Sequence, residues 1–480
     1  MNNSNESERN LTLLTDFYQL TMMNGYLRSG IHNEKATFDL FFRQKGQINY
    51  AVAAGLQQAI EYIQNLRFTD DDIKYLEGLN TFTRDFLDYL KNLRFTGDIY
   101  SVREGEIVFP MEPIMIVRAP LIEAQLIETA LLNIISHQTL IATKASRVNT
   151  AAGEGKVVEF GLRRAQGPDA GIYGSRASII GGASATSNVL AAKMFDIVPK
   201  GTHSHSWVLS FPTELDAFNA FADIYPDSCL LLVDTYDTLR SGVPNAIKVF
   251  DRLKKEGHKP LGIRLDSGDL AYLSKKARQM LDAAGHKDAV IFVSNDIDED
   301  LVNSLNSQGA KIDMYGVGTK LITSEGMPSL GGVYKLAEIE RNGKAVPKLK
   351  KSDSIEKITN PGFKTVYRIY EKESGKAFAD LIALKNEKIG KPLTLTHETE
   401  RWKKTVLEDY DKKELFVKIF DQGKLVYECP PLSESSLYRK EELEKFWDEY
   451  KRLINPHIYK VDLSDGLYEM KQKMLLGNLT

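Results

Sequence analysis

The stretches LLLVDTYDTL (residues 230–239) and GIRLDSGDL (residues 262–270) decide the fold of this chain. Each begins with a short apolar run and releases acidic side chains directly after it. Near-continuous apolar runs are typical of strands that are covered on both faces of a parallel sheet. The two stretches therefore predict consecutive parallel strands.

The same pattern repeats from about residue 155 to residue 320. The junction residues Asp234, Asp266 and Asp296 are separated by 32 and 30 positions, which is the size of a strand–helix–strand unit. We therefore predict an α/β fold, an irregular α/β barrel of about seven strands. The runs expected to form these strands are VVEFG, SIIGG, DIVPKG, LLLVD, GIRLD, VIFVS and MYGVG.

The sequence outside this region predicts an N-terminal domain and a C-terminal module. Residues 1–150 contain a helical start, an alternating strand, a hairpin-like pair and a long helix near 121–143, which indicate an N-terminal α+β domain. We expect residues 330–400 to join that domain and residues 400–480 to form a small C-terminal appended module. Residues 151–330 are the predicted barrel that carries the active site.

Composition excludes several classes of protein. The 480 residues carry 62 basic and 65 acidic side chains, a net charge of −3, so we expect neither a nucleic-acid nor a membrane partner. The start MNNSNESERN lacks the apolar core of a signal peptide, and no run approaches the roughly 18 apolar residues of a membrane helix. Cys229 and Cys429 are too few for a disulfide framework or a cysteine-rich zinc site. We expect a cytoplasmic protein.

Polar residues follow every predicted strand. Enzymes with α/β barrels have their active-site residues at this C-terminal end of the strands. In GIRLDSGDL, Arg264 suits a phosphate or a carboxylate and Asp266 suits a sugar diol, whereas Asp269 is expected to be a helix N-cap. In the stretch VDTYDT, Asp234 is a better ligand candidate than Asp237, which suits a turn or a cap equally well. These residues predict one shared site for an anionic, sugar-containing ligand.

The stretch YGVGTK, residues 315–320, is a second anion-site candidate. Two glycines before a threonine and a lysine let backbone N–H groups approach an anion at a helix start. The chain contains no G-x-x-x-x-G-K-[ST] motif, so ATP, if it is used, is not bound by a Walker A loop.

The stretch GTHSHSW, residues 201–207, holds two of the eight histidines of the chain. The residues themselves leave open a metal site, a general base, a phosphoryl acceptor or a structural role. Zinc is disfavoured because no H-E-x-x-H motif or cysteine pair supplies further ligands.

Seven motifs, taken in their order along the chain, resemble those of the nicotinate phosphoribosyltransferase family, over residues 12 to about 370. They are TDFYQLTM, EFGLRRAQG, GTHSHSW, LLVDTYDTLRSGVPNA, GIRLDSGDL, VSNDIDE and YGVGTK. The resemblance implies an enzyme that converts nicotinate and 5-phosphoribosyl 1-pyrophosphate (PRPP) to nicotinate mononucleotide and pyrophosphate, the first step of NAD salvage from nicotinate. It also implies ATP hydrolysis through a phosphorylated histidine, Mg²⁺ bound with the pyrophosphate, formal membership of the carbon–nitrogen ligases, and a homodimer with a shared active site.

The resemblance also assigns roles to residues. The family motif G-T-x-A-H-S makes His205 the phosphoryl acceptor, puts His203 at the variable position, and shows Ser204 in place of the commoner alanine. Tyr18 is implied to come from the other subunit of the dimer. The implied catalytic residues are His205, Arg264 and Asp266; the implied nicotinate contacts are Tyr18, Phe160, Arg163, Ser184, Thr202 and Arg264; the implied PRPP and phosphate contacts are Arg264, Asp266, Ser294, Asn295, Gly318 and Thr319.

The preferred base can be argued from Ser184. Nicotinamide-using relatives have an aspartate at the corresponding position, which would repel the carboxylate of nicotinate, whereas a serine hydroxyl can donate to it. The alternatives are a nicotinamide or quinolinate phosphoribosyltransferase, a non-catalytic barrel that binds phosphoribosyl ligands, and a metal-dependent hydrolase built on His203 and His205.

Overall fold

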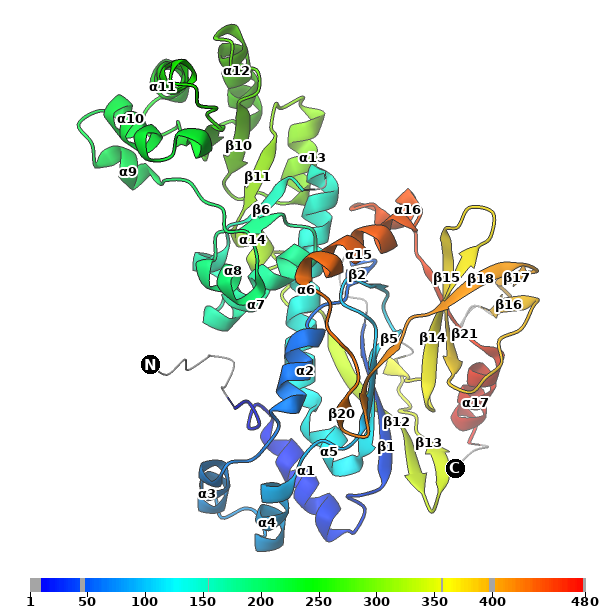
Figure 1. Ribbon diagram of the computed structural model, residues 1–480. Coiled ribbons are helices and arrows are strands. Elements are labelled where there is room, and N and C mark those ends of the chain that lie inside the picture. Colours follow the sequence, from blue (N-terminus) through cyan, green and yellow to red (C-terminus); the bar gives the residue numbers. More distant parts are fainter. Residues whose placement is uncertain (1–9, 44–47, 154, 355–356, 397–401, 478–480) are drawn as a thin grey trace. The chain divides into compact units, whose positions relative to one another are not determined.

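The computed structural model describes residues 10–43, 48–153, 155–354, 357–396 and 402–477 (Figure 1). The sequence MNNSNESERN, on which the expectation of no signal peptide depends, lies outside the described residues except for Asn10. The chain divides into two compact units, residues 1–140 with 329–480 and residues 141–328.

The first unit is built on an antiparallel sheet of seven strands in the order β13-β12-β1-β5-β3-β19-β20. The bounds are β1 Lys35–Phe42, β3 Asp98–Ser101, β5 Pro113–Pro120, β12 Gly332–Arg341, β13 Lys344–Pro347, β19 Val417–Asp421 and β20 Lys424–Leu425. Strand β1 is rich in aromatic residues and pairs with β12 and β5, and across the first pair Phe38 stacks on Tyr334 with ring centroids 4.7 Å apart. The alternating strand and the hairpin expected near the N-terminus are confirmed, and residues after 330 return to the same sheet.

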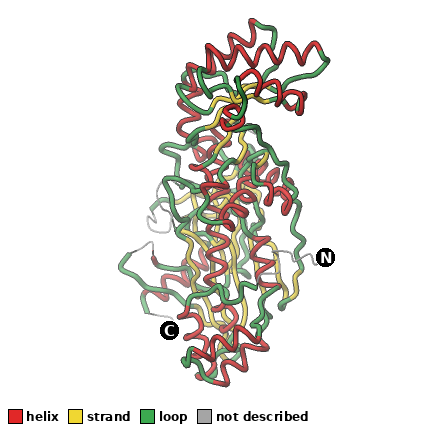
Figure 2. The backbone as a smooth tube through the Cα atoms, turned by 90° about the vertical axis from the view of Figure 1, so that its left-hand side faces the viewer, coloured by secondary structure: helices red, strands yellow, loops and turns green. Residues whose placement is uncertain are grey.

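Helices and small sheets complete the N-terminal part of this unit, with α1, α3 and α4 close together in both views (Figures 1 and 2). The bounds are α1 Phe17–Arg28, β2 Ala51–Val52, α2 Leu56–Gln64, α3 Asp70–Gly78, α4 Arg84–Asn92, β4 Ile107–Val108 and α5 Leu121–Leu126. Helix α6, Glu128–Ala152, begins in this unit and ends in the second. The long helix expected near 121–143 is thus two consecutive helices, with Ile127 between them.

A second sheet of the first unit has four strands in the order β18-β14-β15-β21. Its strands and the neighbouring elements are β14 Lys364–Glu371, β15 Ala377–Leu384, β16 Leu393–Thr396, β17 Lys404–Leu407, β18 Tyr410–Glu414, α15 Leu432–Glu444, α16 Asp448–Lys451, β21 Lys460–Leu463 and α17 Asp465–Leu475. Strand β18 pairs with β14 and β19 pairs with β3, so residues 400–480 are part of the first unit and not a separate module. Single strands need such partners to satisfy their backbone N–H and C=O groups.

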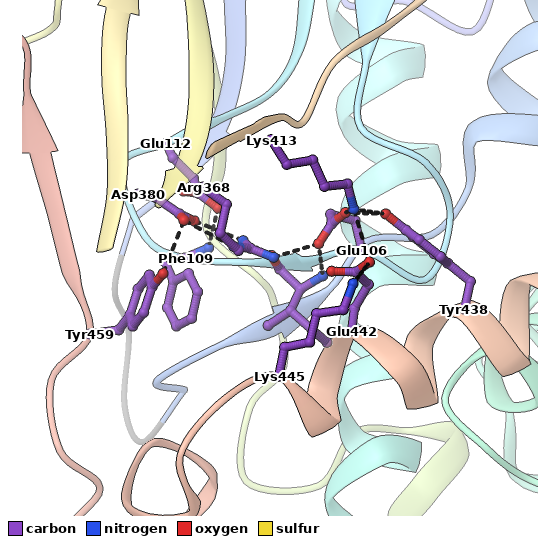
Figure 3. A network of polar contacts seen from close by, with 11 residues as sticks. Glu106, Phe109, Glu112, Arg368, Asp380, Lys413, Tyr438, Glu442, Lys445 and Tyr459 are labelled. Carbon is purple, nitrogen blue, oxygen red and sulfur yellow. Dashed lines mark hydrogen bonds and ion pairs between the residues drawn. The ribbon is translucent and has the colours of Figure 1, made fainter. Parts of the chain in front are cut away.

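A buried ionic network ties this C-terminal part to the N-terminal residues (Figure 3). The guanidinium of Arg368 on β14 lies between Glu106, at 2.5 Å, and Asp380, at 2.8 Å, and none of the three side chains is more than 1% exposed. Lys413 and Tyr438 also bond to Glu106. Buried charges are tolerated only when they are paired in this way.

The second unit contains a parallel sheet of six strands in the order β7-β6-β11-β10-β9-β8. The strands are β6 Val157–Glu159, β7 Ala185–Thr186, β8 Leu230–Leu232, β9 Gly262–Leu265, β10 Val290–Ser294 and β11 Met314–Val317. Helices α11, α12 and α13 lie outside these strands (Figure 1). The helical segments are Leu162–Arg164 (3₁₀), α7 Pro168–Ile180, α8 Val189–Phe195, α9 His205–Leu209, α10 Glu214–Ile224, Pro226–Ser228 (3₁₀), Thr238–Gly242 (π), α11 Val243–Lys255, α12 Leu270–Ala283, α13 Glu299–Ser307 and α14 Thr319–Ile322.

Two of the seven predicted strands differ from expectation. The run SIIGG is the end of helix α7 with its C-terminal cap, and DIVPKG makes a single parallel bridge, Thr186 to Pro199. Short apolar runs cannot distinguish a strand from a buried helix end. Beyond this bridge, the Thr202 hydroxyl donates to the Leu230 carbonyl at 2.8 Å, so the segment after Pro199 lies beside β8 without forming a strand ladder with it.

None of the helices in the described ranges is long and apolar enough to cross a membrane. Burial raises the pKa of the Cys229 thiol to about 12, which keeps that thiol protonated.

Candidate functional site

The candidate site lies where the parallel strands of the second unit end. Asp234 follows β8, Asp266 follows β9, and Asn295 and Asp296 follow β10. Parallel strands bring their carboxyl ends to one edge, which is why residues about 30 positions apart in sequence meet there.

His205 contacts Asp234 directly. The Nε2 atom of His205 lies 3.1 Å from Oδ1 of Asp234, whose side chain is 2% exposed, while the imidazole is 41% exposed. His205 is the first residue of α9, and Ser204 before it stands at the N-cap position in an extended conformation, without a side-chain capping bond. When Nε2 carries the proton and donates to the carboxylate, the lone pair of the imidazole is on Nδ1.

Asp234 is held in place by the loop that follows β9. Its Oδ2 atom accepts from the backbone N–H of Asp266 at 2.9 Å and from the hydroxyl of Ser267 at 2.6 Å. Both oxygens of this carboxylate are therefore engaged, one by the histidine and one by the neighbouring loop.

Arg264, Asp266 and Ser294 form a second cluster at the same edge. Arg264 donates through Nη2 to Asp266 and through Nε to the Ser294 hydroxyl, both at 2.8 Å. Ser294 also donates to Asp266. The cluster leaves Arg264 with N–H groups for an incoming anion, in an orientation that the carboxylate and the hydroxyl determine.

Phe160 provides an aromatic surface beside this cluster. Its ring packs against Phe292 with centroids 5.6 Å apart, and the Arg264 guanidinium lies 5.6 Å from the Phe160 centroid. Gly316 makes this possible, because a Cβ there would lie 2.7 Å from both rings. A planar ring next to a fixed arginine suits an aromatic carboxylate.

Glu159, directly before Phe160, was not predicted as a functional residue. Its fully buried carboxylate accepts from the backbone N–H of Gly161, from Ser175 at 2.9 Å and from Thr186 at 2.5 Å. Burial raises the pKa of Glu159, and these three donors lower it. The network fixes the chain on both sides of Phe160, and an acidic residue inside an apolar run was the only signal in the sequence.

The predicted phosphate loops have unusual backbones. Asn295 and Asp296 have φ values of 103° and 40°, in a region that non-glycine residues rarely adopt. Gly318 precedes the short helix α14, which begins at Thr319. Lys320 of the same motif lies 2.6 Å from Asp298, which raises the pKa of the lysine and occupies its ammonium group.

Two predicted nicotinate contacts have their hydroxyls engaged by the main chain. Ser184, which is exposed, donates to the Val157 carbonyl at 3.0 Å. Thr202 donates to the Leu230 carbonyl and accepts from the His203 N–H at 2.6 Å. Ser184 therefore needs a rotation of its hydroxyl before it can donate to a ligand.

The other predicted residues lie in different settings. Arg163 is exposed in a 3₁₀ turn, and no ion pair involves it within the described ranges. Tyr18 lies on α1 of the first unit and is 50% exposed. Asp269 and Asp237 are helix N-caps, as expected: Asp269 accepts from Tyr272 N–H, and Asp237 accepts from the N–H groups of residues 239 and 240.

The two histidines of GTHSHSW have different partners. Whereas His205 faces Asp234, the Nε2 atom of His203 accepts from the Leu232 N–H at 3.2 Å, and the ring is only 7% exposed. This arrangement does not fit a metal held jointly by both imidazoles.

Comparisons with known proteins show which family this chain resembles. The models of the nicotinate phosphoribosyltransferase (NAPRTase) N-terminal and C-terminal domains match residues 13–136 and 363–471. The nicotinate phosphoribosyltransferase of Bacillus subtilis (strain 168) is 51% identical over 470 residues, 97% of this chain and 95% of that protein. That of Caenorhabditis elegans is 36% identical over 530 residues, with 97% and 93% covered.

Among solved structures, the crystal structure of human nicotinic acid phosphoribosyltransferase superimposes with a TM-score of 0.85 at 30% identity. The match covers 96% of this chain and 99% of the human chain. The resemblance seen in the motifs is thereby confirmed, and so is the mixed α/β fold. The chain belongs to the nicotinate phosphoribosyltransferase family.

Proposed function

We propose that this protein joins N1 of nicotinate to C1 of PRPP, releasing pyrophosphate, and that it hydrolyses ATP through a phosphohistidine in the same cycle. The reaction is the first step of NAD salvage from nicotinate, and its coupling to ATP makes the enzyme formally a ligase. The observation that carries the proposal is the pairing of His205 with Asp234 next to the Arg264, Asp266 and Ser294 cluster.

For the phosphoribosyl transfer, the protein mainly has to position the two substrates and to stabilise the charges that develop on them. The pyridine nitrogen is already a nucleophile, so a strong base is not required. As the N1–C1 bond forms and the C1–O bond breaks, the ribose gains oxocarbenium character and the pyrophosphate gains negative charge. Phe160 is proposed to stack on the pyridine, with Arg264 near its carboxylate and the phosphates.

Further residues complete the substrate contacts. We propose that Arg163 and Thr202 line the nicotinate site and that Asp266 binds the ribose hydroxyls. Ser294 and Asn295 would lie along PRPP, and the backbone of residues 318–319 would bind its 5′-phosphate at the start of α14.

The ATP step uses the imidazole of His205. If Nε2–H donates to Asp234, the lone pair of Nδ1 attacks the γ-phosphorus of ATP, ADP leaves, and water later releases phosphate from the histidine. The phosphoryl group adds about two negative charges beside the pyrophosphate pocket, which would change the affinity for PRPP and pyrophosphate.

Mg²⁺ is proposed to arrive with the pyrophosphate group. In the described part of the chain, no three His, Cys, Asp or Glu side chains are placed to hold a metal ion. Mg²⁺ commonly keeps water and phosphate oxygens as ligands and takes one or two carboxylates, and Asp266, with a side chain 30% exposed, is such a donor. Bound there, the cation would offset charge on the leaving pyrophosphate.

We also propose a homodimer in which Tyr18 enters the partner's active site. Phe17, Tyr18 and Met22 on α1 are 53%, 50% and 37% exposed, an apolar surface of the kind that subunit interfaces cover.

A cytoplasmic location, where PRPP and ATP occur, completes the proposal.

The test is to phosphorylate the protein with γ-labelled ATP and to identify the modified atom with antibodies specific for each phosphohistidine isomer. We expect acid-labile label on Nδ1 of His205, absent from His205→Ala and retained in His203→Gln. Label on His203 alone, or label on Nε2 of His205, would contradict the assignment, since Nε2 faces Asp234.

A further inference from the structure

The barrel of the second unit is not closed by a backbone ladder next to β8. Strand β8 pairs with β9 on one side only, through Leu230, Leu231 and Leu232. On its other side lies the segment that leads into α9, whose last strand-like contact is the bridge at Pro199. Backbone groups on this edge of β8 therefore need other partners.

Two side chains supply those partners. The hydroxyl of Thr202 donates to the Leu230 carbonyl at 2.8 Å, and Nε2 of His203 accepts from the Leu232 N–H at 3.2 Å. The Nδ1 atom of His203 faces the Ser204 carbonyl at 3.4 Å, as expected when the proton is on Nδ1 and the lone pair on Nε2. The side chains of Thr202 and His203 thus bond to backbone groups on the edge of β8 that no neighbouring strand pairs with.

The burial and charge of the His203 imidazole are suited to accepting a hydrogen bond at Nε2. His203 is 7% exposed and packs edge-on against Phe221, with centroids 4.8 Å apart. Burial lowers its pKa to about 4, so the imidazole is neutral and Nε2 can accept at neutral pH.

Helix α9 is also attached through the buried Val208 and through Trp207, whose ring packs against Phe211 with centroids 4.9 Å apart. It is five residues long, too short to be stable alone, and it borders a cavity of about 700 Å³ that Trp207, Phe221 and Tyr225 help to line. The indole N–H of Trp207 donates to the Ala217 carbonyl at 3.0 Å. The cavity leaves one side of α9 without packing, so the bonds of Thr202 and His203 contribute to the position of the residues that lead into the helix.

We infer that His203 is a positioning residue: by accepting from the N–H of Leu232, two residues before Asp234, it holds the start of α9 so that His205 meets Asp234. This inference rests on the proposed phosphorylation of His205. It assigns a task to His203, the first histidine of GTHSHSW, whose hydrogen bonds go to neither Asp234 nor the Arg264 cluster.

The experiment compares two substitutions of His203. Gln places an oxygen where Nε2 lies and keeps the acceptor, whereas Leu keeps apolar volume and removes it. We expect His203→Leu to slow labelling of His205 by γ-labelled ATP about tenfold, as for the loss of one buried hydrogen bond, and His203→Gln to stay within about threefold of the parent protein. Hydrogen exchange of the Leu232 amide should be faster in His203→Leu only.

Val249→Ala is the matched control, because it truncates a buried side chain of α11, a different helix of the same unit. It should lower the thermal midpoint and leave the labelling rate unchanged. Equal labelling rates in the parent and His203→Leu, or equal slowing by Leu and Gln, would overturn the inference. Absence of label from the parent protein would instead remove the proposed phosphohistidine itself.

Discussion

At the scale of single residues, Ser184 offers a test of base preference. Ser184→Asp would place a carboxylate near the carboxylate of nicotinate, and like charges at such a distance repel. We expect kcat/KM for nicotinate to fall at least about tenfold, and the ratio of nicotinamide to nicotinate turnover to rise. Steady-state assays with both bases measure this ratio.

Ser184→Asn is the control for that substitution, since it adds similar volume without charge. It should lower kcat/KM for nicotinate less than Ser184→Asp does. If the aspartate variant used nicotinate as well as the parent protein, Ser184 would not face the carboxylate.

His203 gives the protein a stability that depends on pH. Burial lowers its pKa to about 4, the Ser204 carbonyl opposes that shift, and the charges of Arg264 and His205 add to it. Because the unfolded chain binds the proton near pH 6.5, the contribution of His203 is present above pH 6.5 and is lost as the pH falls toward 4.

Between pH 7 and pH 5 this effect amounts to about 2 kcal/mol of unfolding free energy. The side chain of His203→Gln does not titrate. Urea unfolding at the two pH values should therefore show a smaller decrease in the free energy of unfolding from pH 7 to pH 5 for this variant than for the parent protein. An identical decrease in the free energy of unfolding for both proteins would indicate that His203 is already protonated at pH 7 or is exposed.

At the scale of elements, the ionic network that joins β14, β15 and α15 contains two buried acids of opposite behaviour (Figure 3). Burial raises the pKa of Glu106, but Arg368 and Lys413 lower it below its ordinary value. Burial and the neighbouring Asp380 carboxylate raise the pKa of Glu112 well above its ordinary value. The surroundings therefore favour the ionised form of Glu106 and the protonated form of Glu112.

Substitution by glutamine should separate the two. Glu106→Gln removes the charge that pairs with Arg368 and should cost about 2–4 kcal/mol. Glu112→Gln replaces one neutral group by another and keeps an oxygen for the Phe109 N–H, so it should cost less than about 1 kcal/mol. Thermal unfolding of the two variants tests this order, and equal losses would contradict the assigned charge states.

At the scale of the whole molecule, the proposed shared site predicts complementation between inactive subunits. Tyr18→Ala and His205→Ala should each have little coupled activity. When they are mixed and allowed to exchange subunits, a mixed dimer has one site with both Tyr18 and His205 intact.

With random exchange, half of the dimers are mixed and half of their sites are intact, so activity should return to about a quarter of that of the parent. The control is His205→Ala mixed with Asp234→Ala, whose defects lie in the same unit and cannot complement. A mixture that stays inactive while subunits demonstrably exchange would place Tyr18 in the site of its own chain.

The sequence predicted site residues correctly where the interacting residues lie within one short motif. Arg264 and Asp266 are two positions apart at the end of one strand, and the structure joins them in one ion pair. The caps Asp237 and Asp269 were correct for the same reason. SIIGG was wrong as a strand because local hydrophobicity is the same at a buried helix end.

The sequence by itself determined the family, the rhythm of strands and helices, and the polar residues at the strand ends, since all of these depend on neighbours along the chain. Only the tertiary structure decided that Asp234, 29 positions away, is the partner of His205, and that residues after 400 complete the sheets of the first unit. It also separated His203 from His205. These outcomes depend on which distant backbone and side-chain groups meet when buried hydrogen bonds are satisfied, and local sequence does not contain that information.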